Sequence, residues 1–188
     1  MNIQSLQKNG KESAKRLKTD KNIISIEKVY SSDLKRAIDT AKYAKPGYKI
    51  NIDKRLRERS LGEFEGKYPE DLEKSEEYKK YIINEDYNKF RRDFVQKAPN
   101  GENYTDVINR TKDFLNSINM SEDITIGIFS HMHCIRSIFF NLLNISPREK
   151  LFNMKIENCV PYVIERNKDG KFCLTSHELS KLYNKICW

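Results

Sequence analysis

Long apolar runs are missing from the sequence, and this excludes a membrane-spanning protein. None of its hydrophobic stretches approaches the roughly 20 residues that a transmembrane helix needs, and the first 12 residues hold no hydrophobic signal core. We therefore expect a cytoplasmic protein without a membrane partner. Internal repeats and low-complexity linkers are also missing, and 188 residues suit one domain of ordinary size. The chain is predicted to form a single domain over residues 1–188.

Cysteine is scarce and widely spaced. The four cysteines form no C-x-x-C pair and show no spacing typical of zinc ligands: Cys134, Cys159, Cys173 and Cys187. Reduced and mostly buried thiols are therefore expected. No cluster of metal ligands is visible either, so we predict neither a metal site nor a cofactor.

Unbroken blocks of one charge are missing too. Lysine and arginine total 35 against 27 acidic residues, which gives a net charge of +8, but the two signs are mixed throughout residues 73–94. A basic balance alone fits nucleic acid, an anionic small molecule or only a solvated surface. Without a basic block or a glycine- or serine-rich arm, the pattern argues against nucleic acid.

The central feature of the sequence is the stretch Ile124–Leu143, ITIGIFSHMHCIRSIFFNLL. All but one of its first six residues are apolar, and the run is rich in β-branched side chains, as in a buried strand. From Ile135 the apolar spacing becomes i, i+3, i+4, i+7, i+8, which indicates a helix with one buried face. His131 therefore lies between a strand end and a helix start, where α/β proteins build ligand sites and backbone N–H groups favour anions. A packed or solvated histidine is the alternative interpretation.

The remaining pattern alternates strands with helices and predicts an α/β sandwich around a mostly parallel sheet. Residues 69–96 are predicted to form one or two amphipathic helices, a lid insertion at about 69–97. The other predicted elements are a helix at 11–18, a strand at 23–30, a helix at 31–44 capped by Ser32 or Asp33, a strand at 48–52, a structured loop at 55–66, a helix at 107–118, a short helix opened by a capping box at 146–149, a hairpin of 160–165 with 172–176, and a final helix at 178–188.

Three segments, in this order, resemble the motifs of the histidine phosphatase superfamily, also called phosphoglycerate mutase-like. They are YSSDLKRAIDTA at 30–41, LRERSLGEFEG at 56–66 and IGIFSHMHCIRSIFF at 126–140. Weaker similarities at 5–17 and 99–110 extend the resemblance over about residues 6–162. It implies a three-layer α/β/α sandwich around a mostly parallel sheet, with the family's first strand missing.

The resemblance also assigns roles to individual residues. His131 would be the second histidine of a phosphate pocket and Arg36 the arginine that binds the phosphate. Glu58 would be the general acid, which needs a raised pKa to be protonated near neutral pH. Supporting roles are expected for Glu102 and Ser130. The alternatives are a surface arginine for Arg36 and, for Glu58, an ion pair with a neighbouring arginine.

Two departures from the family pattern affect the predicted chemistry. Where the family has glycine after the second histidine, this chain has Met132, followed by His133, which we place at the pocket rim or helix start. More severely, the sequence contains no Arg-His-Gly motif, which in the family carries the phosphorylated histidine on a strand in the middle of the sheet. The histidines present are His131, His133 and His177, the last without a predicted catalytic role.

These observations leave two main hypotheses. In one, the chain is an N-terminally truncated phosphatase that hydrolyses a phosphomonoester and lacks the nucleophilic histidine. In the other, it is an inactive pseudophosphatase that binds a phosphorylated ligand, so its status as an enzyme is open. The expected partner is a small phosphorylated substrate or inorganic phosphate, and oligomerisation stays open. No Cys-x5-Arg loop, phosphate-binding GK[ST] motif or GxSxG elbow supports another mechanism.

Overall fold

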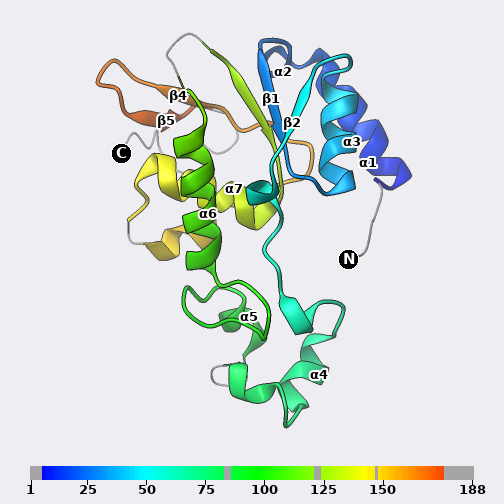
Figure 1. Ribbon diagram of the computed structural model, residues 1–188, viewed down its shortest axis with the longest axis vertical. Coiled ribbons are helices and arrows are strands. Elements are labelled where there is room, and N and C mark those ends of the chain that lie inside the picture. Colours follow the sequence, from blue (N-terminus) through cyan, green and yellow to red (C-terminus); the bar gives the residue numbers. More distant parts are fainter. Residues whose placement is uncertain (1–5, 83–85, 121–123, 147, 176–188) are drawn as a thin grey trace.

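A parallel sheet of three strands lies at the centre of the computed structural model, which describes residues 6–82, 86–120, 124–146 and 148–175 (Figure 1). Its order is β2 (Ile50–Ile52), β1 (Lys28–Ser31) and β3 (Ile126–Phe129). In the register, Val29 lies opposite both Ile50 and Gly127. Because both pairings are parallel, the carboxyl ends of all three strands lie at one edge of the sheet.

Helices cover both faces of this sheet (Figure 1). Helices α1 (Lys8–Arg16) and α3 (Lys35–Ala44) cover one face, and α6 (Tyr104–Ser117) and α7 (Met132–Leu143) the other. Side chains alternate between the faces: Val29 packs with Ala41 on the α3 side, whereas Tyr30 packs with Phe114 on the α6 side. The predicted α/β/α sandwich with a mostly parallel sheet is confirmed.

A side chain caps the start of α6, whereas no side-chain hydrogen bond caps α3. At α6, the Asn103 side chain accepts from the N–H of Asp106 and the Asp106 carboxylate accepts from the N–H of Asn103, a full capping box. At α3 the prediction of Ser32 or Asp33 as the N-cap is wrong, because the capping residue is Leu34. The Ser32 hydroxyl instead accepts from the N–H of Leu34 at 3.2 Å, one step ahead of the helix.

Residues 57–101 form a helical extension that projects beyond the amino end of α6, away from the sheet (Figure 1). Its helices, α4 (Pro69–Lys74) and α5 (Tyr87–Phe90), are six and four residues long, so the one or two amphipathic helices predicted over residues 69–96 are present as two short ones. The backbone turns extended at Ser75, which ends α4, and the Asp86 side chain caps the start of α5. The extension has its own core: Phe64, Leu72, Ile82, Tyr87, Phe90 and Ala98.

Short turns and a second sheet complete the fold. The predicted strand at 23–30 is shorter, because Asp20 caps a helical turn, α2 (Lys21–Ile24), that precedes β1. Three 3-10 turns lie in the 54–81 region: η2 (Lys54–Leu56), η3 (Gly62–Phe64) and η4 (Lys79–Tyr81). After α7, the predicted short helix is the 3-10 turn η6 (Arg148–Asn153), and β4 (Ile164–Arg166) pairs antiparallel with β5 (Phe172–Leu174) as the predicted hairpin. Another 3-10 turn, η1 (Leu17–Thr19), follows α1.

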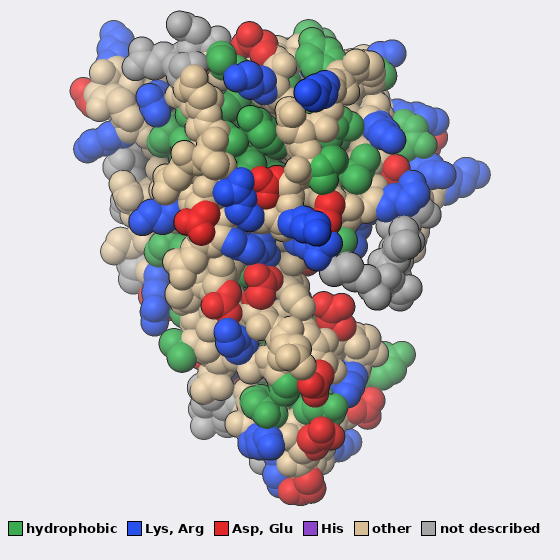
Figure 2. Space-filling model, in the orientation of Figure 1, with side chains coloured by type: hydrophobic (Ala, Val, Ile, Leu, Met, Phe, Trp, Pro, Cys, Tyr) green, Lys and Arg blue, Asp and Glu red, His purple; other side chains and the backbone are tan. Residues whose placement is uncertain are grey.

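The structure describes three of the four cysteines. Cys134 and Cys173 are buried and Cys159 is half-buried, and Cys134 and Cys159 are free thiols. Cys187, His177, Pro147 and the predicted helix at 178–188 lie outside the described residues. No helix within the described ranges has the length and apolar character needed to cross a membrane. On the face shown in Figure 2, basic and acidic side chains lie interspersed.

Candidate functional site

Three of the predicted site residues follow the three strands of the sheet and meet at its carboxyl edge. Arg36 lies in the first turn of α3 after β1, Glu58 lies in the loop after β2, and His131 follows β3 and caps α7. Because the strands are parallel, these segments converge although 95 residues separate Arg36 from His131. The contact is direct: the Arg36 Nε donates to the His131 Nδ1 at 3.2 Å.

This contact fixes the state of the His131 ring. Since Arg36 donates to Nδ1, that nitrogen is the acceptor and the ring proton lies on Nε2. Burial lowers the pKa of His131 to about 4, with Glu58 opposing the shift and Arg36 adding to it. The ring is therefore neutral near pH 7. Its Nε2 is buried and has no hydrogen-bond partner among the described residues. Such an unpaired buried donor costs free energy, which a ligand acceptor would recover.

Glu58 is held through one of its two carboxylate oxygens. Oε1 accepts from the backbone N–H of Arg59 at 2.9 Å, the backbone N–H of His133 at 3.2 Å and the His133 Nδ1 at 3.1 Å. The other oxygen, Oε2, accepts no hydrogen bond from the described residues. Glu58 thus presents one fixed oxygen and one open oxygen at the edge of the sheet.

The structure overturns the expected raised pKa of Glu58. Burial by itself would raise this pKa, but the hydrogen bond and charge of His133, helped by the Arg59 N–H, outweigh it and lower the pKa to about 2. The alternative of an ion pair with a neighbouring arginine is also not formed. Arg57 pairs with Asp33 at 2.6 Å, and the Arg59 guanidinium donates to backbone carbonyls.

Bonds between loops hold the converging segments together. Arg57 donates through Nε and Nη2 to the two carboxylate oxygens of Asp33, at 2.7 and 2.6 Å, and so joins the loops after β1 and β2. The Ser130 hydroxyl donates to the carbonyl of Leu56 at 2.8 Å and joins the loops after β2 and β3. The supporting role of Ser130 stays a prediction.

Glu102 contacts the residues that hold the backbone around Glu58. Its carboxylate accepts from Arg110 Nε at 2.7 Å and Nη2 at 3.1 Å, and from the backbone N–H of Ser60 at 2.9 Å. Arg110 in turn donates to the carbonyls of Arg55 and Glu58. These contacts place Glu102 as a brace for the backbone around Glu58, and its supporting role stays a prediction.

Sequence reasoning missed the contact between His133 and Glu58. The sequence places His133 at the pocket rim or helix start. It lies in the first turn of α7, and its side chain is about 10% exposed and binds a carboxylate 75 residues earlier in the chain. The available signal was its position: the first turn of a helix that starts at a strand end faces the loops after the neighbouring strands. Within the described residues, no group of three or more histidine, cysteine or acidic side chains is arranged to hold a metal ion.

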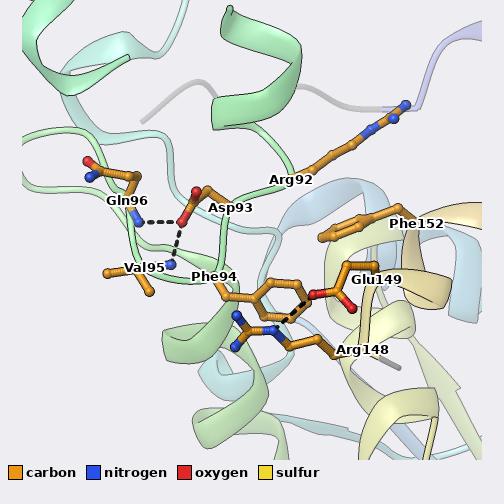
Figure 3. Close-up of a pocket in the computed structure, with 8 residues that line it drawn as sticks. All are labelled: Arg92, Asp93, Phe94, Val95, Gln96, Arg148, Glu149 and Phe152. Carbon is orange, nitrogen blue, oxygen red and sulfur yellow. Dashed lines mark hydrogen bonds and ion pairs between the residues drawn. The ribbon is translucent and has the colours of Figure 1, made fainter. Parts of the chain in front are cut away.

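A surface pocket of about 400 Å³ lies apart from these residues, between the 92–96 segment and η6 (Figure 3). Figure 3 shows the Arg148 guanidinium against the Phe94 ring, 4.3 Å from its centroid. The rings of Phe94 and Phe152 both pack on Tyr104, whose ring centroid lies 5.4 Å from that of His133. Tyr104 therefore separates this pocket from the site at the strand ends.

A sheet with helices on both faces, and an arginine, a histidine and a carboxylate gathered at the ends of its strands, define a phosphatase-like α/β protein. The chain belongs to the histidine phosphatase superfamily (branch 1), whose family model matches residues 4–178. A comparison with curated proteins finds no match.

Solved structures share this fold at low sequence identity. A provisionally assigned alpha-ribazole-5'-P phosphatase from Escherichia coli is 21% identical, with a TM-score of 0.75 over 91% of this chain and 82% of its own. The mycobacterial glucosyl-3-phosphoglycerate phosphatase, solved with VO3, is 20% identical, with a TM-score of 0.73 over 92% and 86%. Phosphoserine phosphatase from Entamoeba histolytica, solved with 3-phosphoglyceric acid, is 21% identical, with a TM-score of 0.70 over 92% and 83%.

Proposed function

We propose that this chain carries the phosphate-binding part of a phosphomonoesterase site. Arg36 and His131 would bind oxygens of the phosphoryl group, and Glu58 would face the oxygen of the leaving group. The observation that carries the proposal is the Arg36–His131 contact, which leaves the buried Nε2–H of His131 without a protein acceptor. The structures of relatives with vanadate and with a phosphorylated acid support the same substrate class.

Arg36 suits this role because its guanidinium can serve two partners at once. Its Nε is committed to His131, and its Nη atoms donate to no described residue. A planar guanidinium with open Nη groups can bind two phosphoryl oxygens while its charge offsets theirs. Together with the Nε2–H of His131, these donors would stabilise the charge that spreads over the phosphoryl oxygens during transfer.

Glu58 can act as an acid only if its proton affinity rises when substrate binds. A phosphoryl dianion beside the carboxylate would disfavour its charged form and raise its pKa from the low value set by His133. The proton would then reside on Oε2, since Oε1 is occupied by three N–H donors. From there it would pass to the leaving oxygen.

The proposal does not assign a nucleophile to any residue of the given sequence. In His131, Nε2 carries the proton and Nδ1 accepts from Arg36, so neither nitrogen offers a lone pair to phosphorus. We infer that turnover needs a preceding segment with an Arg-His-Gly motif, so that the present sequence is a truncated form of a phosphatase. The alternative is a pseudophosphatase that binds phosphorylated ligands without turnover.

The helical extension, as a lid over about residues 69–97, would set the substrate. Arg59 supports a link between lid and site: its guanidinium donates to the carbonyls of Arg91 and Glu102, both at 2.7 Å, while its backbone N–H donates to Glu58.

We further propose that the ligand is a small phosphorylated compound and that the protein is cytoplasmic.

Two measurements test the proposal. Inorganic phosphate should raise the melting temperature of the protein, and His131→Ala should abolish this shift, because the Nε2–H donor is lost. An unchanged shift in His131→Ala would refute phosphate binding at this site. Hydrolysis of an aryl phosphate that His131→Ala abolishes would exclude the pseudophosphatase.

The coding DNA decides between the two forms of the proposal. If the DNA upstream of Met1 encodes, in frame, an apolar segment followed by Arg-His-Gly, the truncated phosphatase is supported. A protein extended to include this segment should then hydrolyse the aryl phosphate. A stop codon directly before Met1 would refute the truncation and leave the pseudophosphatase.

A further inference from the structure

His133 contacts Glu58 through two separate donors on one residue. Its backbone N–H and its ring Nδ1 both lie within 3.2 Å of the Glu58 Oε1. Because a carboxylate can only accept, the ring proton must lie on Nδ1. The ring itself is buried and packs on Tyr104, and this leaves it little freedom to turn away.

The two carboxylate oxygens of Glu58 therefore differ in the number of hydrogen bonds that they accept. Oε1 receives three N–H groups, which stabilise negative charge there, whereas Oε2 receives none from the described residues. A proton that joins this carboxyl therefore goes to Oε2. Of the three donors, two are backbone N–H groups, which only proline would remove, and the third is the ring of His133.

We propose that His133 is a positioning residue for Glu58, holding Oε1 in place and setting the pH range in which Oε2 can carry a proton. The inference rests on the proposed function, in which that proton goes to the leaving oxygen. It adds a residue that would act on the leaving oxygen through Glu58 and not by direct contact with the substrate.

Other charged and titratable groups face Glu58 and have to be weighed against His133. Arg59 turns its guanidinium toward the extension, so that it contributes to Glu58 mainly a backbone N–H. The remaining groups are His131 from the loop after β3, its partner Arg36 from α3, Arg110 and Tyr104 from α6, and Cys134 from α7. Among all of these, His133 is the side chain that hydrogen-bonds the carboxylate.

Two substitutions separate the ring's hydrogen bond from its charge. In His133→Asn, the amide nitrogen can occupy the place of Nδ1 and donate to Oε1, but it does not titrate. In His133→Leu, a side chain of similar bulk fills the space without a donor. The backbone donors stay in both variants. The difference between the two variants therefore reports the side-chain hydrogen bond, and the difference between wild type and His133→Asn reports the charge of the ring.

The experiment is an NMR titration of the Glu58 carboxyl carbon in the protein without phosphate, with the signal assigned by its loss in Glu58→Gln. The wild-type pKa should be about 2. It should rise to the ordinary glutamate range or above in His133→Leu, because burial then acts without its main opponent, and His133→Asn should lie between. Glu12→Gln, which removes an exposed carboxylate on α1, should leave the Glu58 titration unchanged.

A Glu58 titration that stays the same in His133→Leu would overturn the proposal. Should that variant fail to fold, the wild-type protein decides the question, because nitrogen chemical shifts report which ring nitrogen carries the proton. A proton on Nδ1 of His133 agrees with the proposal, and a bare Nδ1 refutes it.

Adding inorganic phosphate separates this inference from the proposed function. If phosphate binds beside Glu58, it should move the carboxyl titration to higher pH in the wild type. No movement would contradict the proposed phosphate site, while the comparison of variants without phosphate would still judge His133.

Discussion

Replacing Arg36 by lysine tests whether the guanidinium fork, and not only a positive charge, binds phosphate. Lysine keeps the charge but loses both the Nε donation to His131 and the paired Nη donors. A hydrogen bond to a charged group contributes about 1.5–3 kcal/mol. Since about 1.4 kcal/mol corresponds to a tenfold change, the Kd for inorganic phosphate should rise about 10- to 100-fold in Arg36→Lys.

Titration calorimetry with phosphate at neutral pH measures this change. Arg36→Ala should weaken binding further, because it removes the charge as well. Lys35→Ala provides a matched control, because it removes one positive charge from the neighbouring position, where the lysine pairs with Asp39 at 2.7 Å. Since salt screens the charge of an exposed lysine, we expect its Kd for phosphate to stay within about threefold of wild type. An Arg36→Lys protein that binds phosphate as well as wild type, or a Lys35→Ala protein that loses binding equally, would refute the assignment of Arg36.

Three further predictions concern stability. Arg59→Met should lower the free energy of unfolding by about 2 kcal/mol, measured in urea, because two backbone carbonyls lose their donor. Gly62→Ala should cost more than about 1 kcal/mol, because this glycine has φ +53° and a Cβ would lie 2.1 Å from the carbonyl oxygen of Pro99. Acid should destabilise the protein: the folded pKa is about 2 for Glu58 and about 4 for His131, below the ordinary 4.5 and 6.5, so the unfolded chain binds more protons as the pH falls. Each pKa shift corresponds to about 3 kcal/mol in the free energy of unfolding. This stability is lost between pH 6.5 and 4 for His131 and between pH 4.5 and 2 for Glu58.

Matched variants make these predictions specific. Gly47→Ala places a methyl group at φ +81° but with no atom within 4 Å, so it should cost less than Gly62→Ala. Equal losses would contradict the argument from close approach. For the acid effect, Glu58→Gln should flatten the pH dependence below pH 4.5 and leave the part between pH 6.5 and 4.5, and a parallel curve would contradict the lowered pKa of Glu58.

The strand ends and the convergence of Arg36, Glu58 and His131 were predictable from the sequence. The period of apolar residues changes from strand to helix within a few positions after Phe129, and that signal is local. Parallel strands then bring their carboxyl ends together without any knowledge of side chains. The motifs around Arg36 and Glu58 supplied the order in which segments meet.

The electrostatics and the helical extension were not predictable in the same way. Burial raises the pKa of Glu58, and a histidine 75 residues away in the chain is the main group that lowers it. In the extension, Phe64 packs on Tyr78 and Phe90, so an aromatic cluster rather than helical periodicity organises residues 57–101. Short segments that pack through such clusters leave no regular period for a sequence pattern to detect.

The contacts between loops explain why the motifs act as one structural unit. The sheet fixes where the backbone leaves each strand, but the positions of the functional side chains depend on bonds that cross from loop to loop. Asp33 of the first motif binds Arg57 of the second, and Leu56 of the second accepts from Ser130 of the third. Removing one of these bonds should therefore shift residues that it does not touch, and substitutions in two of the motifs should not be additive. The geometry around Glu58 is then a property of all three loops together, which is why no single motif is sufficient to define it.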